Sequence, residues 1–407
     1  MPARPASPRP VLTVALCCAV ALLEGFDLQS TGITAPFLAK AFGLAPAQLG
    51  WVFSAGLMGL LPGAFLGGWL ADRAGRKGTL LAAVLLFGAF TLFTAHASSY
   101  PGLLLARLLT GLGLGAALPI IIAVASEAAA PRLRSTAVSL TYCGVPLGGA
   151  LASLISLSGV GEQWRTVFHI GGLAPLLIAV ALLVWLPRLG VAATSQRAEG
   201  SPAGRLFSQG RARQTLLLWL ACFFTLTVLY LLLNWLPSLL MAKGFDRVQA
   251  GWVQVLFNLG GAAGSLLTGR LMDRRRTGLA VVIAYLGMLV ALAGLGLAAT
   301  FTGMALAGVL GGYCCIGAQL VLYALAPRVY PADMRATGVG ACVAVGRLGS
   351  MAGPLAAGQI LAAGAGVGGV LLAASPGLVV AALAALALVG EGRGKAFSGN
   401  IVNSIND

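Results

Sequence analysis

Apolar segments about as long as a bilayer is thick follow one another along almost the whole chain. A helix of about 20 apolar residues spans the hydrocarbon core of a membrane. Twelve such segments are expected, at residues 11–37, 49–71, 79–97, 101–126, 135–157, 166–187, 214–241, 248–271, 278–298, 302–327, 336–360 and 370–390. Only 9% of the residues are charged, far fewer than in a soluble domain. The sequence therefore predicts an all-α polytopic membrane protein.

The positive charges are distributed unevenly between the two sides that these spans define. Twelve spans place both termini on one side. Of the 26 lysines and arginines, those on the other side are Lys40, Arg165, Lys243 and Arg247, and Arg107 and Arg347 lie within spans. Cytoplasmic loops are rich in Lys and Arg, so both termini are expected in the cytoplasm. The net charge of +15 then reflects topology and contact with anionic lipid, and nucleic-acid binding is not expected.

The longest polar segment divides the spans into six and six. We expect one bundle at 1–187, a cytoplasmic linker at 188–213, a second bundle at 214–390 and a disordered tail at 391–407. The halves repeat at a constant offset, since Gly68-x-x-x-Asp72-Arg73 matches Gly269-x-x-x-Asp273-Arg274. Arg134-x-Thr136 likewise matches Arg335-x-Thr337. A duplicated unit of this kind predicts two pseudo-symmetric six-helix bundles with a substrate path between them.

A loop between the second and third spans carries a specific signature, Gly68-x-Leu-Ala-Asp72-Arg73-x-Gly75-Arg76-Lys77. It resembles the loop motif of the major facilitator superfamily of transporters, in which this loop is a conformational latch. The resemblance implies the fold of that family, with Gly68 permitting close helix approach. The latch is expected to comprise Gly68, Asp72, Arg73, Gly75, Arg76, Glu127, Arg134, Asp273 and Arg335, with Glu127 pairing Arg132 and Arg134. The alternative is a plain loop kept inside by its positive charge.

Two acidic residues, Glu24 and Asp27, lie inside the first apolar segment of a chain that has only 11 acids. A carboxylate near the middle of a bilayer costs several kcal/mol unless it is paired or protonated. Glu24 is about 20 Å into its helix, and residues three apart share one helix face. Burial favours the neutral form of a carboxyl group, which can then load and release a proton. We prefer Asp27 as the coupling group and Glu24 as its neighbour; the alternative is a pair that only bonds adjacent helices.

The motif Glu24-Gly25-Phe26-Asp27 resembles the first-helix motif of the aromatic acid:proton symporter family. Further similar segments are Gly111 to Pro119, Tyr142-Cys143-Gly144-Val145-Pro146 and Ala336 to Gly349. Glu at the first acidic position resembles the branch that imports 3-(3-hydroxyphenyl)propionate. The resemblance implies an aromatic monocarboxylate substrate, a proton as co-substrate and a monomeric protein in the inner membrane of a bacterium. It also implies proton coupling for Arg107, for which packing or pairing is an equal alternative.

Arg347 lies near mid-depth in the eleventh span, where an unpaired guanidinium would be costly. Its planar donor fork suits a carboxylate, so we expect it to anchor the substrate or to pair with Asp27 or Glu24 when the site is empty. A permanent ion pair between the halves is the alternative. Because aromatic rings stack on aromatic residues and ring hydroxyls need polar partners, the same pocket is expected to include Tyr230, Asn234, Trp235, Asn258, Tyr313, Gln319 and Tyr323.

The sequence contains no catalytic triad, phosphate loop or metal-binding motif, so neither an enzyme nor a cofactor is expected and an ion gradient must drive transport. A proton-driven efflux antiporter of the same fold is the main alternative. Gly144-Val145-Pro146-x-Gly148-Gly149 partly matches an antiporter signature, but Val145 interrupts its Gly-Pro pair. A membrane scaffold or sensor would leave the buried charges unexplained.

Overall fold

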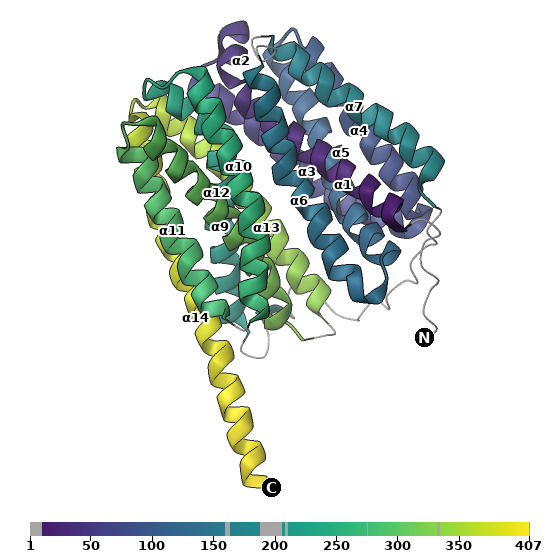
Figure 1. Ribbon diagram of the computed structural model, residues 1–407, viewed down its shortest axis with the longest axis vertical. Coiled ribbons are helices and arrows are strands. Elements are labelled where there is room, and N and C mark those ends of the chain that lie inside the picture. The colour runs from purple at the N-terminus through teal and green to yellow at the C-terminus, as the bar shows by residue number, and fades with distance from the viewer. Residues whose placement is uncertain are drawn as a thin grey trace.

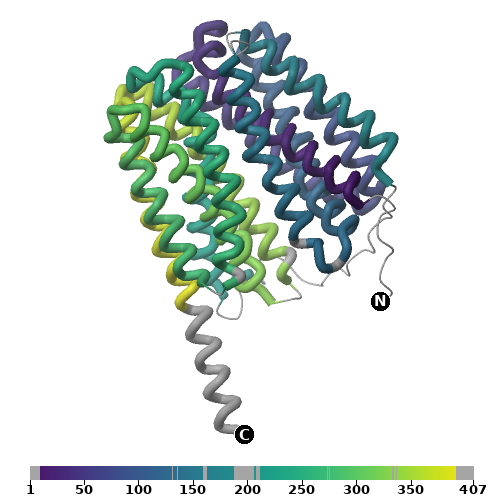
Figure 2. Tube along the Cα trace, in the orientation of Figure 1, coloured from purple at the N-terminus to yellow at the C-terminus, as the bar shows by residue number. Residues whose placement is uncertain are grey.

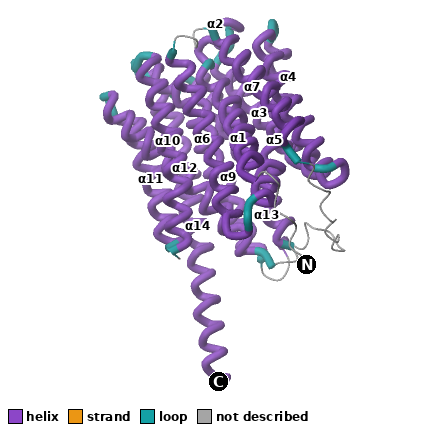
Figure 3. Tube along the Cα trace, turned by 45° about the vertical axis from the view of Figure 1, so that its right-hand side comes forward, coloured by secondary structure: helices purple, strands orange, loops and turns teal. Residues whose placement is uncertain are grey.

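A computed structural model describes residues 10–158, 163–187, 206–207, 211–274, 276–331 and 334–406. Figure 3 shows that the regular structure within these residues is helical. The first half contains α1 (Pro10–Ile33), α2 (Ala35–Phe42), α3 (Pro46–Ala74), α4 (Arg76–His96), α5 (Tyr100–Ala128), η1 (Pro131–Leu133), α6 (Arg134–Leu157) and α7 (Trp164–Trp185). The second contains α9 (Ala212–Ala242), α10 (Arg247–Asp273), α11 (Thr277–Leu297), α12 (Phe301–Val329), α13 (Arg335–Ala362) and α14 (Gly366–Asn406).

Each of the twelve predicted spans corresponds to one long helix. Within the described residues, eleven helices are both long and apolar enough to cross a membrane. The remaining long helix is α10, which has 27 residues but carries the amides Gln249, Gln254 and Asn258. These amides lower its hydropathy, and two of them are fully buried against other helices. The polar residues of α10 therefore face protein, where they find hydrogen-bond partners.

The first predicted span, 11–37, ends earlier than expected, because the chain breaks at Thr34 between α1 and α2. Pro36 lies in the first turn of α2, and a proline disfavours helical continuation through the residue before it. The short helix α2 then ends at Gly43, whose φ of 64° is the left-handed conformation that suits a helix C-terminus.

The helices form two groups that lie side by side, α1–α7 and α9–α14 (Figures 1 and 2). The groups meet where α3 packs against α13, α6 against α10 and α1 against α9. We call the end at which α1 begins the terminal end and the end at which α2 lies the distal end (Figure 1). This arrangement places α1, α6, α9, α10 and α13 around the interface between the two groups.

The glycine of the Glu24–Asp27 motif permits the close approach of α1 to α6. A Cβ atom added at Gly25 would lie 1.8 Å from the carbonyl oxygen of Val145. From the other helix, a Cβ atom at Gly148 would lie equally close to the carbonyl oxygen of Leu22. Small residues at such crossings let two membrane helices pack backbone to backbone. The motif therefore combines polar residues with the packing that fixes their positions.

The division of the chain into domains stays a prediction. Much of the linker 188–213 lies outside the described residues, as do the side chains of the tail 391–407.

Candidate functional site

A small enclosed cavity lies between the two helix groups. Its volume is about 40 Å³, and seven helices contribute its lining: Glu24, Leu28 and Gln29 of α1, Leu118 of α5, Tyr142, Val145 and Pro146 of α6, Leu229, Tyr230 and Leu233 of α9, Asn258 of α10, Ile316 and Gln319 of α12, and Arg347 of α13. Most of this surface is apolar, with a few polar groups that converge on it, as in sites for small organic ligands. The volume suits a few water molecules, so a larger ligand requires the two groups to separate.

Arg347 is the cation of this cavity. Its Nη1 donates a hydrogen bond of 2.8 Å to the hydroxyl of Tyr230. Among the described residues, no carboxylate lies within ion-pair distance of its guanidinium. The predicted ion pair of Arg347 with Asp27 or Glu24, and the alternative of a permanent ion pair between the halves, are therefore absent from the described residues. Its remaining donors are available for an acidic ligand.

Glu24 lines the same cavity and is almost completely buried, with 1% of its surface exposed. Its Oε2 atom has no hydrogen-bond partner among the described residues. A buried carboxylate oxygen without a partner is destabilising if it carries charge. Such groups are rare in native proteins, so the position of this one at a cavity deserves an explanation.

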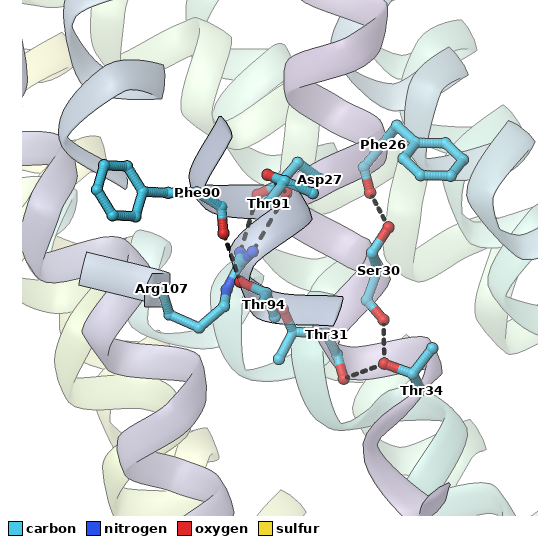
Figure 4. Close-up of polar contacts among 9 residues, drawn as sticks. All are labelled: Phe26, Asp27, Ser30, Thr31, Thr34, Phe90, Thr91, Thr94 and Arg107. Atoms are coloured by element: carbon cyan, nitrogen blue, oxygen red, sulfur yellow. Dashed lines mark hydrogen bonds and ion pairs between the residues drawn. The ribbon is translucent and has the colours of Figure 1, made fainter. Parts of the chain in front are cut away.

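Asp27 has a different environment, which Figure 4 shows. Its Oδ2 accepts a hydrogen bond of 2.9 Å from Arg107 Nη2, and its Oδ1 accepts bonds from Arg107 Nη1 at 3.2 Å and Thr91 at 2.7 Å. Asp27 is 0% exposed and Arg107 3%. Arg107 thus forms an ion pair within the first helix group, which is the pairing role that the sequence left open.

This geometry corrects the expectation that Glu24 and Asp27, three residues apart, share one helix face. Glu24 lines the cavity, whereas Asp27 turns towards α4 and α5. Side chains three residues apart are separated by about 60° around a helix. That angle is enough to direct them to different neighbours when several helices surround α1.

The predicted pocket residues fall into two sets. Tyr230, Asn258 and Gln319 line the cavity, whereas Tyr323 does not line it and accepts a hydrogen bond of 3.2 Å from Gln319. Asn234, Trp235 and Tyr313 do not line it. Asn234 donates to the carbonyl of Tyr230, and Trp235 donates to the carbonyl of Pro354 and packs edge-on against Phe53. These two residues stabilise α9 and its contact with α3 and α13.

Three buried amides, which we call the amide clasp, join the two helix groups next to the cavity. They are Gln29 of α1 and Gln254 and Asn258 of α10, each at most 2% exposed. Gln29 and Asn258 exchange two hydrogen bonds of 2.7 Å, and Gln254 donates to Gln29 Oε1 at 2.8 Å. A Cβ atom at Gly149 would lie 1.8 Å from Gln29 Nε2, so this glycine makes room for the clasp.

Sequence reasoning missed Gln29, Gln254 and the cavity-lining Tyr142. Gln29 lies five residues after Glu24 in the same apolar helix. A further polar side chain in that helix was the only indication of its role that the sequence offered. An uncharged amide costs less to bury than a carboxylate and therefore stands out less from the sequence. Tyr142 belongs to a segment that the family resemblance singled out, but no single feature distinguished it from a packing residue.

The predicted latch is only partly assembled at the terminal end. Arg76 forms an ion pair with Glu127, whereas Arg132 and Arg134 were the expected partners of Glu127. Gly75 has a φ of 92° in the turn between α3 and α4, a conformation that favours glycine. A Cβ atom at Gly68 would meet no atom within 4 Å, so the prediction of close helix approach at Gly68 is wrong. That role belongs to Gly67, which packs against Ala116 of α5.

The other latch residues are less informative. Asp72 is exposed, and the guanidinium of Arg73 lies over the ring of Trp69, with 4.2 Å between its Cζ atom and the ring centroid. Arg134 and Arg335 are exposed at the starts of α6 and α13. The side chain of Asp273 lies outside the described part of the chain.

Comparison with known proteins identifies the family. The family model of the Major Facilitator Superfamily matches residues 17–354 and 241–400. The chain belongs to the major facilitator superfamily. It is 52% identical over 383 residues to a protein of Escherichia coli (strain K12) named 3-(3-hydroxy-phenyl)propionate transporter, with 94% of this chain and 95% of that protein covered. It is 35% identical to the 4-hydroxybenzoate transporter PcaK of Pseudomonas putida, over 93% of this chain and 92% of that one.

Solved structures support the same fold. A D-xylose-proton symporter matches with a TM-score of 0.75 at 17% identity, covering 93% of this chain and 96% of its own. The nucleoside transporter NupG matches with a TM-score of 0.76 at 18% identity, covering 93% and 99%. The predicted major facilitator fold and the resemblance to aromatic-acid transporters are therefore confirmed.

Proposed function

We propose that this protein is a proton-coupled symporter that imports an aromatic monocarboxylate by alternating access. The substrate is 3-(3-hydroxyphenyl)propionate or a related phenolic acid. The observation that carries the proposal is that one half-buried cation, Arg347, and one buried carboxyl group, Glu24, line the same cavity, whose other lining residues are largely apolar and aromatic. The names of the relatives, which are transporters of aromatic acids, support the substrate class.

Arg347 anchors the carboxylate of the substrate in this proposal. Its guanidinium offers a planar pair of donors, and a charge-assisted bond in a cavity sheltered from water is strong. The aromatic ring then packs against apolar residues such as Leu118 and Ile316, beside Tyr142. Gln319 and Asn258 are amides that the second helix group contributes to the lining, where they can bond a ring hydroxyl.

Charge balance assigns the proton to Glu24. The cavity lining holds one guanidinium, and a bound aromatic acid already neutralises it. A second negative charge on Glu24 would then be buried without compensation, so Glu24 must be protonated when the substrate is bound. Binding of the acid and of one proton is therefore linked. This proposal replaces the preference for Asp27 as the coupling group, because Asp27 is already paired with Arg107.

The proposed topology determines which end of the molecule an imported acid enters. The excess of Lys and Arg on the side of the termini supports a cytoplasmic position for the terminal end and an inner-membrane location. The distal end then faces outward, and import carries the acid from the distal to the terminal end. A monomer in contact with membrane lipid suffices, because one chain supplies both helix groups.

Uptake of radiolabelled 3-(3-hydroxyphenyl)propionate into proteoliposomes tests the proposal. An imposed inward proton gradient should drive saturable accumulation that collapses with a protonophore. A weak acid also accumulates passively along such a gradient, so protein-free liposomes and liposomes with the Arg347→Gln variant are the controls. Uptake equal in all three preparations would overturn the proposal. Proton-stimulated export of the acid or of a cationic dye would support the efflux antiporter instead.

A further inference from the structure

The amide clasp lies on the distal side of Glu24. Helix α1 runs from the terminal end to the distal end (Figure 1), so Gln29, five residues after Glu24, is about 7.5 Å closer to the distal end. Helix α10 runs the opposite way, and Gln254 in its first half lines the same small pocket as Phe37 of α2. An acid that enters from the distal end therefore meets the clasp before it reaches Glu24.

Close packing of α3 against α13 joins the same two helix groups. The hydroxyl of Ser54 donates a hydrogen bond of 2.9 Å to the carbonyl of Met351. A Cβ atom added at Gly50 would lie 2.9 Å from the carbonyl oxygen of Pro354, so the backbones themselves are in contact. Interiors packed this closely do not admit a ligand without moving. A substrate can therefore pass from the distal end only when the groups separate and the clasp parts.

Parting of the clasp leaves buried polar groups without partners. Gln29 Oε1 accepts hydrogen bonds from both Gln254 and Asn258, and Gln29 Nε2 donates to Asn258 Oδ1. All three bonds run between α1 and α10, so separation of the helices breaks all of them. Gln254 Oε1 already accepts no hydrogen bond from the described residues. Because unpaired buried donors and acceptors are destabilising, opening is costly unless an incoming group replaces these bonds.

A phenolic hydroxyl has the chemistry to replace them. It is a donor and an acceptor in one group, so it can accept a hydrogen bond from one amide and donate to the other. Gln29 and Asn258 both line the central cavity, and they come from opposite helix groups. An acid without a ring hydroxyl would leave both amides unpaired. Sites that bond a substrate hydroxyl strongly reject analogues that lack it, for this reason.

We propose that the amide clasp is a gate on the distal side of the cavity, and that Gln29 and Asn258 select for a ring hydroxyl by binding it as they part. The proposal rests on the proposed import function. Arg347 holds the carboxylate, and the hydroxyl bridges the two separated amides. The bridge stabilises the open gate, whereas an acid without the hydroxyl opens it without that gain. Gln29 is therefore a specificity-determining residue.

Equilibrium binding of two matched acids to the purified protein tests the selectivity. The acids 3-(3-hydroxyphenyl)propionate and 3-phenylpropionate differ only in the hydroxyl. Wild type should prefer the hydroxylated acid by about 10- to 100-fold, as expected when buried amides are otherwise left unpaired. Gln29→Met keeps a long, unbranched side chain and should lower this preference by about tenfold. The hydroxyl then loses one partner, and 3-phenylpropionate no longer has to break the clasp.

A buried amide elsewhere provides the control. Asn234 donates to the carbonyl of Tyr230 in its own helix and does not line the cavity, so Asn234→Leu should keep the wild-type preference. If Gln29→Met fails to fold, Asn258→Leu removes the same pair from α10 and should have the same effect. Loss of the preference in Gln319→Met but not in Gln29→Met would place the hydroxyl away from the clasp and overturn the proposal.

Opening of the gate is tested separately by labelling Ser54→Cys in intact cells with a membrane-impermeant maleimide. Ser54 is 0% exposed where α3 meets α13, so labelling requires the groups to separate. Protein without Ser54→Cys gives the background from the native cysteines. At saturating concentrations, the hydroxylated acid should speed labelling more than 3-phenylpropionate does. Adding Gln29→Met should speed labelling without either acid, because the clasp is already broken.

Failure of the gate and failure of the import function give different results. Wild type that binds and imports both acids equally well would overturn the selective gate and leave import intact. Gln29→Met protein with an unchanged preference or unchanged labelling would do the same. Failure of wild type to bind either acid would instead count against the import function.

Discussion

The two carboxyl groups of α1 have opposite environments although they lie three residues apart. Both are buried, with 0% of Asp27 and 1% of Glu24 exposed. Asp27 accepts three hydrogen bonds, two of them from Arg107, whereas Glu24 Oε2 accepts none from the described residues. Position along the helix therefore does not determine the role of a buried acid. Its partners do, and they come from different neighbouring helices.

This difference predicts a division of labour. The Asp27 carboxylate has a matched counter-charge, so its loss leaves Arg107 buried without one. Glu24 faces a cavity where its charge state depends on what else is bound there. We therefore expect Asp27 to stabilise the first helix group and Glu24 to exchange the proton. Four substitutions test this division, in order of decreasing effect.

The largest effect is expected for Asp27→Asn. Breaking one side of a buried ion pair costs about 3–5 kcal/mol, because the other charge stays buried and unpaired. Thermal unfolding of the purified protein should show a large loss of stability, and all modes of transport should fall with the amount of folded protein. The double variant Asp27→Leu, Arg107→Met should recover most of the stability. An Asp27→Asn protein as stable as wild type that had lost only uphill uptake would reverse the roles proposed for the two acids.

Glu24→Gln should affect coupling and leave folding nearly unchanged. Glutamine keeps the shape and polarity of the protonated side chain but cannot release a proton. The accumulation ratio should fall to the passive value found in protein-free liposomes, while exchange of external for internal acid continues. Counterflow and proton-driven uptake, measured in the same proteoliposomes, separate these outcomes. Uphill accumulation at the wild-type level would exclude Glu24 as the proton carrier.

The sequence predicted the helices and the buried charges but not the partners of those charges. Apolar segments determine spans directly, because their length must match the membrane. Glu24, Asp27, Arg107 and Arg347 stand out because a buried charge is costly in any arrangement. Which of them meet depends on how far each helix is rotated about its axis. Contacts such as that of Gly25 with Val145 set the rotation, and a single sequence does not reveal them.

The amide clasp illustrates the same limit for uncharged groups. Asn258 was expected to bind substrate, and the structure adds that it bonds Gln29 across the two helix groups. Single amides in apolar helices are common and predict no particular partner. Which amides meet in this protein depends on packing, because Gly149 leaves space for Gln29 beside α10.

Arg347→Lys tests the central cavity from the side of the cation. Lysine keeps the charge but loses the planar fork that binds a carboxylate through two parallel bonds. The affinity for 3-(3-hydroxyphenyl)propionate at the central site should fall about 10- to 100-fold, the equivalent of about 1.5–3 kcal/mol. Equilibrium binding and thermal unfolding of the same preparation separate affinity from stability. Unchanged affinity would remove Arg347 from the substrate site and leave Glu24 without the charge balance that links it to the acid.

The smallest effect is expected for Tyr230→Phe. The hydroxyl of Tyr230 holds the guanidinium of Arg347 at 2.8 Å and lines the same cavity. Its removal deletes one hydrogen bond and leaves the charge of Arg347 in place, so affinity should fall about fivefold, the equivalent of about 1 kcal/mol. Tyr323→Phe is the matched control, because Tyr323 bonds Gln319 and does not line the cavity. Equal losses in the two variants would mean that the hydroxyls act through packing. A loss confined to Tyr230→Phe would show that the Tyr230 hydroxyl orients Arg347 for substrate binding. No residue around Asp27 has that role.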